Sequence, residues 1–248
     1  MFVFVPAATL NLQPLSARSI VLSLLLGTHP PQRQVRHLIG SAALFGVSES
    51  AVRVALTRMT SAGELERDNG SYTLNARLLE RQRHQDDSIN GPTVTWSGDW
   101  EQAIVVATGR AAAQRARLRA DLTALRLAEL REGVWMRPAN LDRTWPAEAE
   151  QSVALFSVRP TGTATDLVSA LWDLPAWIAD ANALLDHFAA STDPLTRLTA
   201  AAAIVHHLTS DPLLPPELLP AKWPGGQLRD TYAAYQAELI TLTDSFTD

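Results

Sequence analysis

The sequence predicts a mostly helical chain with an α+β segment in its middle. Apolar residues recur at helical spacing between residues 16 and 62 and again from Thr165 to the end of the chain. Between residues 100 and 158, short apolar runs of strand length accompany a single helical stretch. The 248 residues, 46% of them hydrophobic, can form two or three small domains with cores of their own.

The chain contains no cysteine, which excludes disulfide scaffolds, thiol catalysis and Cys-ligated zinc. A reducing, cytoplasmic setting is therefore expected. The apolar run Met1–Ala8 has no basic start and is interrupted by Pro6, so we expect a tail or an added strand rather than a signal peptide. No apolar stretch reaches the ~18 residues of a membrane helix, and we expect no membrane partner.

The net charge of −5 is spread unevenly along the chain. Residues 1–90 carry nine arginines and seven acidic residues, whereas residues 91–248 carry twelve basic and nineteen acidic residues. A mildly basic front region on an acidic body is compatible with nucleic-acid binding, because only one face of such a protein needs to be positive.

The front region predicts three helices. Ser16 can cap the first helix, and Gln32–Leu44 forms a second amphipathic segment. A short turn follows, in which Gly46 supplies the positive φ that the chain reversal needs. Ser48 then caps a third helix, which ends at Gly63.

The third helix has two chemically different faces. At about 100° per residue, its apolar side chains share one side: Val52, Ala55, Leu56 and Met59. The other side carries Ser50, Arg53, Thr57 and Ser61, flanked by Val54 and Arg58. Arginine can bond guanine or phosphate, hydroxyls can bond several bases, and an aliphatic group can meet a thymine methyl. This face is therefore suited to the major groove of DNA.

Two short alternating segments after Gly63 are joined by Asn69-Gly70, which is a strong hairpin signal. Three helices followed by a hairpin form a winged helix-turn-helix. We expect the DNA contacts to come from Ser48, Ser50, Arg53, Val54, Thr57 and Arg58 of the third helix and from Arg67 and Ser71 of the hairpin. The alternative is a small helical subdomain whose arginines are only solvated.

The turn signal Asn90-Gly91-Pro92 marks the boundary to the middle region. Beyond it the pattern predicts a strand, a helix and two further extended segments, within Trp100–Thr108, Arg110–Arg126, Leu127–Met136 and Ser152–Val158. This order predicts a small α+β domain with helices on one face of a sheet. We therefore predict an N-terminal extension over residues 1–15, a winged helix over 16–90 and a middle domain over 91–164.

Residues 165–248 predict a helical C-terminal domain. In Thr165–Ala190, Pro175 either starts a second helix or kinks the first. Asp193 and Pro194 are the expected N-cap and first residue of the next helix. Five prolines within Asp211–Gly226 exclude a long helix there. The last amphipathic helix, Gln227–Phe246, has one stripe formed by Leu228, Tyr232, Tyr235, Leu239 and Leu242.

Several strings of this chain, taken in order, resemble one family. Residues 45–65, which include FGVSESAVRVALTRM and AGEL, resemble the pattern FG(I/V)SExAVRxALxRLxxxGxL of the N-terminal domain of PaaX-type regulators. The resemblance continues through WSGDW (96–100), GVWMRP (133–138) and LWDL (171–174) to DPLLPPELLP (211–220) and WPG (223–225). No single string is decisive, but the ordered set is highly specific.

The resemblance implies a homodimeric winged-helix regulator with a ferredoxin-like middle domain, similar to the small nuclease of CRISPR adaptation. Such regulators often repress catabolic operons at an inverted-repeat operator, and an acyl-CoA effector releases them from the double-stranded DNA. Two departures stand out. Val106-Ala107-Thr108 replaces the family's Asp-x-Pro, which removes a candidate metal carboxylate, and the wing carries fewer arginines than is usual in the family.

An acyl-CoA effector would need an aromatic pocket and phosphate-binding cations. The candidates are Trp135, Trp172, His206, Arg115 and Arg119. The alternatives are that the tryptophans and the histidine pack in cores and that the arginines form a solvated helix face. His206 and His207 lie about 100° apart on one helix, so they cannot chelate one ion as residues four apart do.

The sequence contains no G-x-S-x-G, H-E-x-x-H or G-x-G-x-x-G motif and no phosphate-binding glycine loop. We therefore expect no catalytic residues, no metal and no cofactor. Two alternatives to the regulator remain open. One is a metal-dependent nuclease on the middle domain, for which no carboxylate pair is evident. The other is a protein-interaction module that has kept the fold and lost DNA binding.

Overall fold

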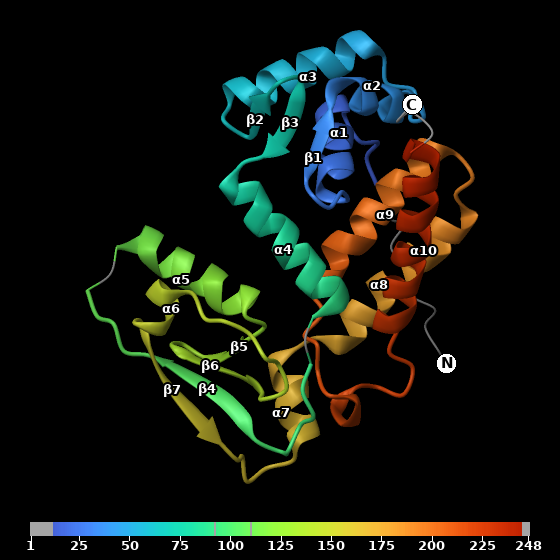
Figure 1. Ribbon diagram of the computed structural model, residues 1–248. Helices are drawn as coiled ribbons and strands as arrows, with labels where there is room; N and C mark the ends of the chain where they lie inside the picture. Colours follow the sequence, from blue (N-terminus) through green and yellow to red (C-terminus); the bar gives the residue numbers. More distant parts are fainter. Residues whose placement is uncertain (1–11, 92, 110, 245–248) are drawn as a thin grey trace. The chain divides into compact units, whose positions relative to one another are not determined.

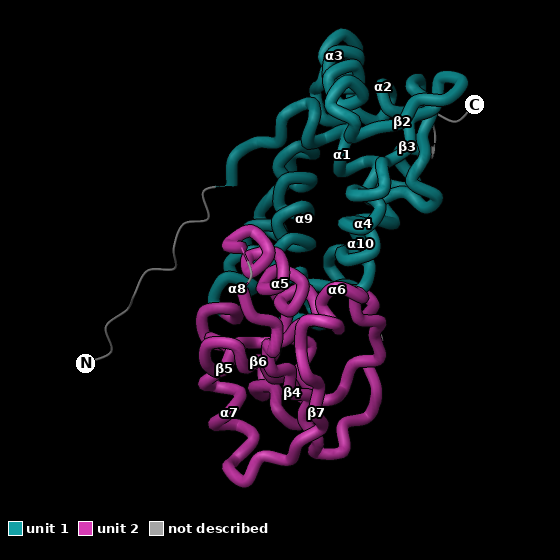
Figure 2. Tube along the Cα trace, turned by 90° about the vertical axis from the view of Figure 1, so that its left-hand side faces the viewer, with its two compact units in different colours: residues 1–89, 179–209, 224–248 teal, residues 90–178, 210–223 magenta. Residues whose placement is uncertain are grey.

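The computed structural model describes residues 12–91, 93–109 and 111–244, which form two compact units (Figure 2). Unit 1 takes in the described parts of residues 1–89, 179–209 and 224–248, and unit 2 those of residues 90–178 and 210–223. The predicted run Met1–Ala8 lies outside the described residues. Within the described ranges, no helix combines the length and apolar character needed to cross a bilayer.

The predicted winged helix-turn-helix is confirmed in unit 1 (Figure 1). Its elements are α1 (Ala17–Leu26), β1 (Gln32–Gln34), α2 (Val35–Ala43), α3 (Glu49–Ser61), β2 (Leu65–Asp68) and β3 (Ser71–Leu74). The strands form an antiparallel sheet in the order β1-β3-β2. The prediction of a helical segment over Gln32–Leu44 is wrong for residues 32–34, which form β1. Gln32 pairs with Thr73 in β3, so strand pairing overrides the local preference.

The predicted turns and caps are confirmed. Gly46 has φ 73°, while Asn69 and Gly70, with φ 46° and 79°, form the turn of the β2–β3 hairpin. Asp193 caps α9 (Pro194–Leu208), which begins with Pro194. Of the two alternatives for Pro175, the structure has a second helix, because α8 (Leu174–Ala190) follows α7 (Ala164–Leu171) after a break.

The winged helix shares one apolar core with the C-terminal helices of unit 1. Ile20 and Leu56 belong to the same buried cluster as Leu198 and Ala201 of α9 and Tyr235 of α10 (Gly225–Asp244). From the predicted stripe of α10, Leu228 and Tyr235 are buried, whereas Leu242 is 48% exposed. The winged helix therefore does not have a core separate from the C-terminal helices.

Side-chain amides satisfy the carbonyl groups at the C-terminal end of α1, which have no partner within the helix. The buried Gln82 of α4 (Ala76–Asn90) donates from Nε2 to the carbonyl oxygens of Leu26, at 2.7 Å, and Thr28, at 3.0 Å. Gln236 of α10 donates from Nε2 to the carbonyl oxygen of Gly27 at 3.2 Å. These bonds connect α1 to α4 and α10.

Unit 2 contains the predicted ferredoxin-like domain, which is confirmed by its β-α-β-β-α-β order and its strand order β5-β6-β4-β7. Its elements are β4 (Trp100–Val105), α5 (Ala112–Ala124), β5 (Ala128–Arg131), β6 (Val134–Pro138), α6 (Ala147–Glu150) and β7 (Val153–Val158). All neighbouring strands are antiparallel. Helices α5 and α6 cover one face of the sheet (Figure 1), where Ala103 and Trp135 pack against Leu118 and Leu122.

The opposite face of this sheet packs against α7 and the proline-rich segment that contains the 3₁₀ helix Pro216–Leu218. Trp100 and Met136 on this face belong to one buried cluster with Val168 and Leu214. Because successive residues of a strand point to opposite faces, the two cores are built from alternating positions of the same strands.

A fully buried arginine joins the sheet to the proline-rich segment. Arg137 donates to the carbonyl oxygens of Arg126 and Leu213, each at 3.2 Å, and to Asn140 Oδ1 at 2.8 Å. Arg126 and Leu213 have φ 64° and 50°, a backbone conformation that costs about 1 kcal/mol or more without glycine. Burial lowers the pKa of Arg137 to about 9, so its hydrogen bonds must offset a desolvation cost.

We predict that Arg137→Met lowers the free energy of unfolding by about 3 kcal/mol. Methionine fills the space of the side-chain stem but leaves several buried carbonyl groups without a donor, each at a cost of ~1–3 kcal/mol. The measurement is denaturant unfolding followed by circular dichroism. Arg131→Met, at an exposed position of β5, is the matched control and should change stability by less than about 0.5 kcal/mol. Equal effects of the two substitutions would contradict the role of Arg137.

Candidate nucleic-acid interface

Helix α3 begins with a hydroxyl cap. Ser48 Oγ accepts a hydrogen bond from the backbone N–H of Ala51 at 3.3 Å, and Ser50 Oγ lies 3.1 Å from Ser48 Oγ. The acidic side chain of Glu49 lies in the first turn, where the helix dipole favours it. Both serines are exposed, so their remaining lone pairs face solvent.

The apolar face of α3 determines which side chains the helix exposes. Val52, Leu56 and Met59 are at most 1% exposed and lie in the core that they share with α1. With these residues buried, the helical period leaves Arg53 and Thr57 exposed. Val54 is 50% exposed, although it is a β-branched apolar residue.

Arg53 is held by an acidic neighbour on its own helix. Its Nε and its terminal nitrogen lie 2.8 and 2.7 Å from Glu49 Oε1. This pair, four residues apart, is the part of the surface that our sequence interpretation missed, although its spacing is readable in the sequence. Thr57 Oγ1 donates to the carbonyl oxygen of Arg53 at 2.9 Å, which leaves the hydroxyl oxygen able to accept from solvent or a ligand.

The remaining predicted DNA-contacting residues lie on the same domain. Arg58 is exposed and has no ion-pair partner in the described parts of the chain. In the hairpin, Arg67 is exposed and lies over the ring of Tyr72, with 5.9 Å between its Cζ and the ring centroid. Ser71 is half-buried and pairs with Asp68. The structure thus brings the eight residues onto α3, its cap and the hairpin, and their role in DNA binding stays a prediction.

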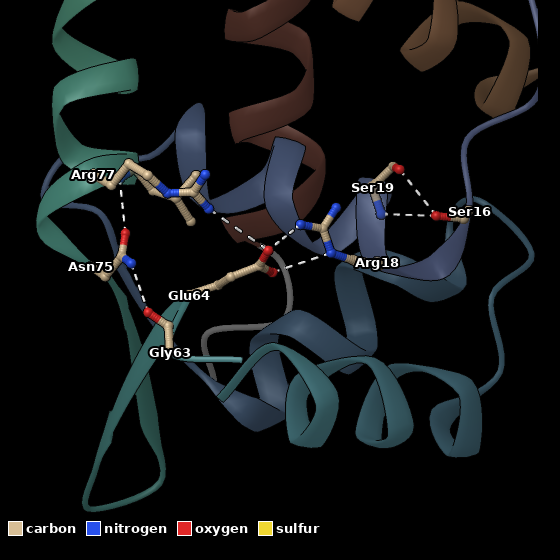
Figure 3. A network of polar contacts seen from close by, with 8 residues as sticks. Ser16, Arg18, Ser19, Gly63, Glu64, Asn75 and Arg77 are labelled. Atoms are coloured by element: carbon tan, nitrogen blue, oxygen red, sulfur yellow. Dashed lines mark hydrogen bonds and ion pairs between the residues drawn. The ribbon is translucent and has the colours of Figure 1, made fainter. Parts of the chain in front are cut away.

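A carboxylate at the end of α3 connects three elements of the winged helix (Figure 3). Glu64 accepts two hydrogen bonds from Arg18 of α1, at 2.5 and 3.1 Å, and lies 3.9 Å from a terminal nitrogen of Arg77 of α4. Beside it, Asn75 Nδ2 donates to the carbonyl oxygen of Gly63 at 2.6 Å. The side chain of Glu64 is only 14% exposed, so the two-bond pair with Arg18 is partly shielded from water.

The predicted effector residues belong to different clusters and units. In unit 2, Trp135 is buried, and Arg119 Cζ lies 5.3 Å from the centroid of its ring, with Arg119 also paired to Glu129 at 2.5 Å. Arg115 is exposed on α5. Trp172 packs in the cluster on the opposite face of the sheet, and His206 is exposed on α9 of unit 1. Trp135 and Arg119 contact each other, whereas Trp172 lies in another cluster, so the five residues stay separate proposals.

Known families and solved structures match the chain along most of its length. Three family models match in chain order: PaaX-like protein at residues 16–78, PaaX protein central Cas2-like domain at residues 93–166, and PaaX-like protein C-terminal domain at residues 175–248. Among solved structures, uncharacterized protein Rv0674 from Mycobacterium tuberculosis is 44% identical over 94% of this chain and 99% of that chain, with a TM-score of 0.81. No curated protein matches.

We predict that Glu64→Gln lowers the free energy of unfolding by about 1 kcal/mol. The substitution keeps the size of the side chain but replaces a charge-assisted, two-bond pair with Arg18 by weaker neutral bonds. Thermal or denaturant unfolding measures the change. Glu66→Gln, at an exposed position of β2, removes an equal charge and should leave stability unchanged. If both variants unfold alike, Glu64 does not stabilise this end of α3.

Proposed function

Because the chain belongs to the PaaX-like family, we propose that it is a DNA-binding transcriptional regulator that reads its operator with α3 in the major groove. The observation that carries this proposal is the exposed face of α3. Ser50, Arg53 and Thr57 offer a guanidinium group and two hydroxyls on one side of a capped helix, and Val54 adds an apolar group beside them. These groups match the donors, acceptors and methyl groups of base edges.

The pair between Glu49 and Arg53 does not prevent DNA binding. Both side chains are more than half exposed, and such a pair on a helix contributes about 0.3–0.5 kcal/mol. A two-bond contact from arginine to guanine favours the correct base over a wrong one by about 1–3 kcal/mol. Guanine can therefore replace Glu49 as the partner of Arg53. The pair holds the guanidinium group near the start of the helix until DNA replaces the carboxylate.

The proposed regulator is a homodimer that binds an inverted repeat. Strand β7 lies at one edge of the four-stranded sheet and pairs only with β4 among the described strands. Leu155 and Phe156 of this strand are 40% and 48% exposed, although adjacent residues point to opposite faces of a sheet. An unpaired strand edge with exposed apolar groups supports association with a second copy.

The proposed role is repression of a catabolic operon, relieved by an acyl-CoA-type effector. Arg115 and Arg119, both exposed on α5, would supply cations for phosphate groups, with Trp135, Trp172 and His206 as further candidates. Since Arg119 is already paired with Glu129, phosphate binding there would have to displace a carboxylate. The family resemblance is the main support for the effector class.

We predict that Arg53→Ala weakens specific DNA binding by about 1–3 kcal/mol, because it removes the best base-reading group of α3. A suitable duplex is one that the intact protein selects from a random library, and gel-shift titration gives the affinity. Glu49→Gln is the companion variant. It releases Arg53 without removing it, so it should bind as tightly as the intact protein or more tightly. Unchanged affinity and sequence preference in Arg53→Ala would reject the proposed role of this residue.

We predict that Phe156→Glu converts the dimer into a monomer, because a charge would be buried at the edge of β7. Light scattering coupled to size-exclusion chromatography measures the mass at equal protein concentrations. Leu130→Glu is the control, since Leu130 is 42% exposed on β5 at the other edge of the same sheet. A monomeric intact protein, or equal behaviour of both variants, would contradict an interface at β7.

A further inference from the structure

A cavity of about 100 Å³ lies within unit 1, between helices α1 and α2 of the winged helix and helices α9 and α10. Its apolar lining includes Leu24, Leu38, Leu198, Val205 and Leu239. Its polar lining includes Arg33, His37, Arg81, Gln85 and Tyr235. It reaches the surface, because Arg81 and Ile240 are lining residues with exposed side chains. None of the residues predicted to bind DNA or an effector lines this cavity.

Two residues that line the cavity each have a buried polar atom without a hydrogen-bond partner among the described residues: Tyr235 Oη and His37 Nε2. Tyr235 is only 7% exposed, and its ring packs against Phe188 at a centroid distance of 5.7 Å. Burial raises the pKa of Tyr235, so its hydroxyl keeps its proton and can donate. A buried donor without an acceptor destabilises the folded state, and a ligand in the cavity would supply the missing acceptor.

The charges around the cavity favour an anion. Arg33 and Arg81 have no ion-pair partner in the described residues, and no acidic residue is among those that line the cavity. Arg33 Nε donates to Thr28 Oγ1 at 3.2 Å, which leaves its terminal nitrogens for a ligand. Burial, then the positive charges of Arg36 and Arg33, lower the pKa of His37. The nearby Asp86 is bonded to His29 at 2.9 Å instead.

The volume limits the size of the ligand. An apolar cavity of about 150 Å³ accommodates benzene, and one water molecule takes up about 30 Å³ of the liquid. The cavity here, at about 100 Å³, is smaller than that reference and opens to the surface, so it favours a small ligand over one that carries a phenyl ring. A short alkyl chain satisfies the apolar walls within this limit.

We propose that this cavity binds a short aliphatic carboxylate whose alkyl chain packs against Leu24, Leu38 and Val205. Its carboxylate accepts hydrogen bonds from the polar set of Arg33, His37 and Tyr235, and Arg81 at the mouth adds a further positive charge. The ligand would touch α2, which packs against α3, and also α10, whose Gln236 both lines the cavity and bonds Gly27 of α1. A change of DNA affinity on ligand binding rests on the proposed function, whereas binding itself does not.

Isothermal titration of the full-length protein with isovalerate tests the proposal, with isovaleramide as the uncharged probe of the same shape. We expect isovalerate to bind with 1:1 stoichiometry and isovaleramide to bind at least tenfold more weakly. Equal binding of the two probes, or binding of neither, would overturn the proposal. Phenylacetate serves as a size control and should bind more weakly than isovalerate, whereas tighter binding would contradict the size argument.

Three variants locate the site. Arg81→Gln should weaken isovalerate at least several-fold, while Arg83→Gln, an exposed position on the same helix that does not line the cavity, should leave it unchanged. Tyr235→Phe should weaken binding without lowering the unfolding temperature, because it removes a hydroxyl that has no partner. Ala202→Leu should abolish binding by filling the cavity. The ligand binds elsewhere if the Arg81 and Arg83 variants have equal affinities for isovalerate and Tyr235→Phe binds it as tightly as the intact protein.

Two further measurements separate this site from the proposed function. If isovaleryl-CoA binds and isovalerate does not, the proposal of a free acid is overturned. The proposed function, with its acyl-CoA effector, is then unaffected. Gel shifts with and without isovalerate test the coupling to DNA. Tight isovalerate binding in a protein that binds no duplex would contradict the proposed function alone, and DNA binding without any isovalerate binding would contradict this cavity alone.

Discussion

The packing of α3 against α1 is the interaction on which the rest of the account depends. Val52, Leu56 and Met59 are buried in the core of unit 1, and each such side chain contributes about 1.5–3 kcal/mol when it is fully buried. Because these residues share one face of the helix, α3 cannot rotate about its axis without exposing them. The same burial therefore directs Arg53 and Thr57 outward in one orientation.

Both ends of this helix are held in addition to its middle. Ser48 caps the N-terminal end, and Glu64, just beyond the C-terminal end, is bonded to Arg18 of α1. The core below α3 continues into α9 and α10 through Leu198 and Tyr235. Because the winged helix and the C-terminal helices share this core, a ligand bound between α1, α2, α9 and α10 can change the packing of α3. The cavity, with its unpaired polar groups, lies at this junction.

Local chemistry accounts for what could be predicted from the sequence. Gly46 and Gly70 allow a positive φ because they lack a Cβ, Asn69 tolerates one, and the carboxylate of Asp193 caps a helix; all of these local features were confirmed. Val52, Leu56 and Met59 recur at helical spacing among polar residues. This pattern predicted both α3 and its exposed face. The strand Gln32–Gln34 could not be predicted, because its pairing with β3 depends on residues some forty positions away.

The remaining features depend on contacts between distant residues. Arg18 and Glu64 are 46 positions apart, and Arg137 bonds the carbonyl oxygen of Leu213, 76 positions away. Neither pair has a local signal in the sequence. For the effector, residue type alone suggested Trp135, Trp172 and His206, but the structure places them in different clusters or units. Composition can identify such residues as chemically suitable, yet it carries no information about whether the fold brings them together.

Site-directed cleavage of DNA shows whether α3 lies in the major groove, and the absence of cysteine in the chain makes the experiment practical. A single cysteine at the exposed position Val54 carries an iron–EDTA probe, and the protein is bound to a duplex that it selects from a random library. We predict cuts confined to the major groove of two half-sites about one helical turn apart, or a multiple of that distance. A probe at the exposed Ala234 of α10 should leave those positions uncut. Absence of cleavage from position 54 in a complex that forms, or the same cuts from both positions, would show that α3 does not read the DNA.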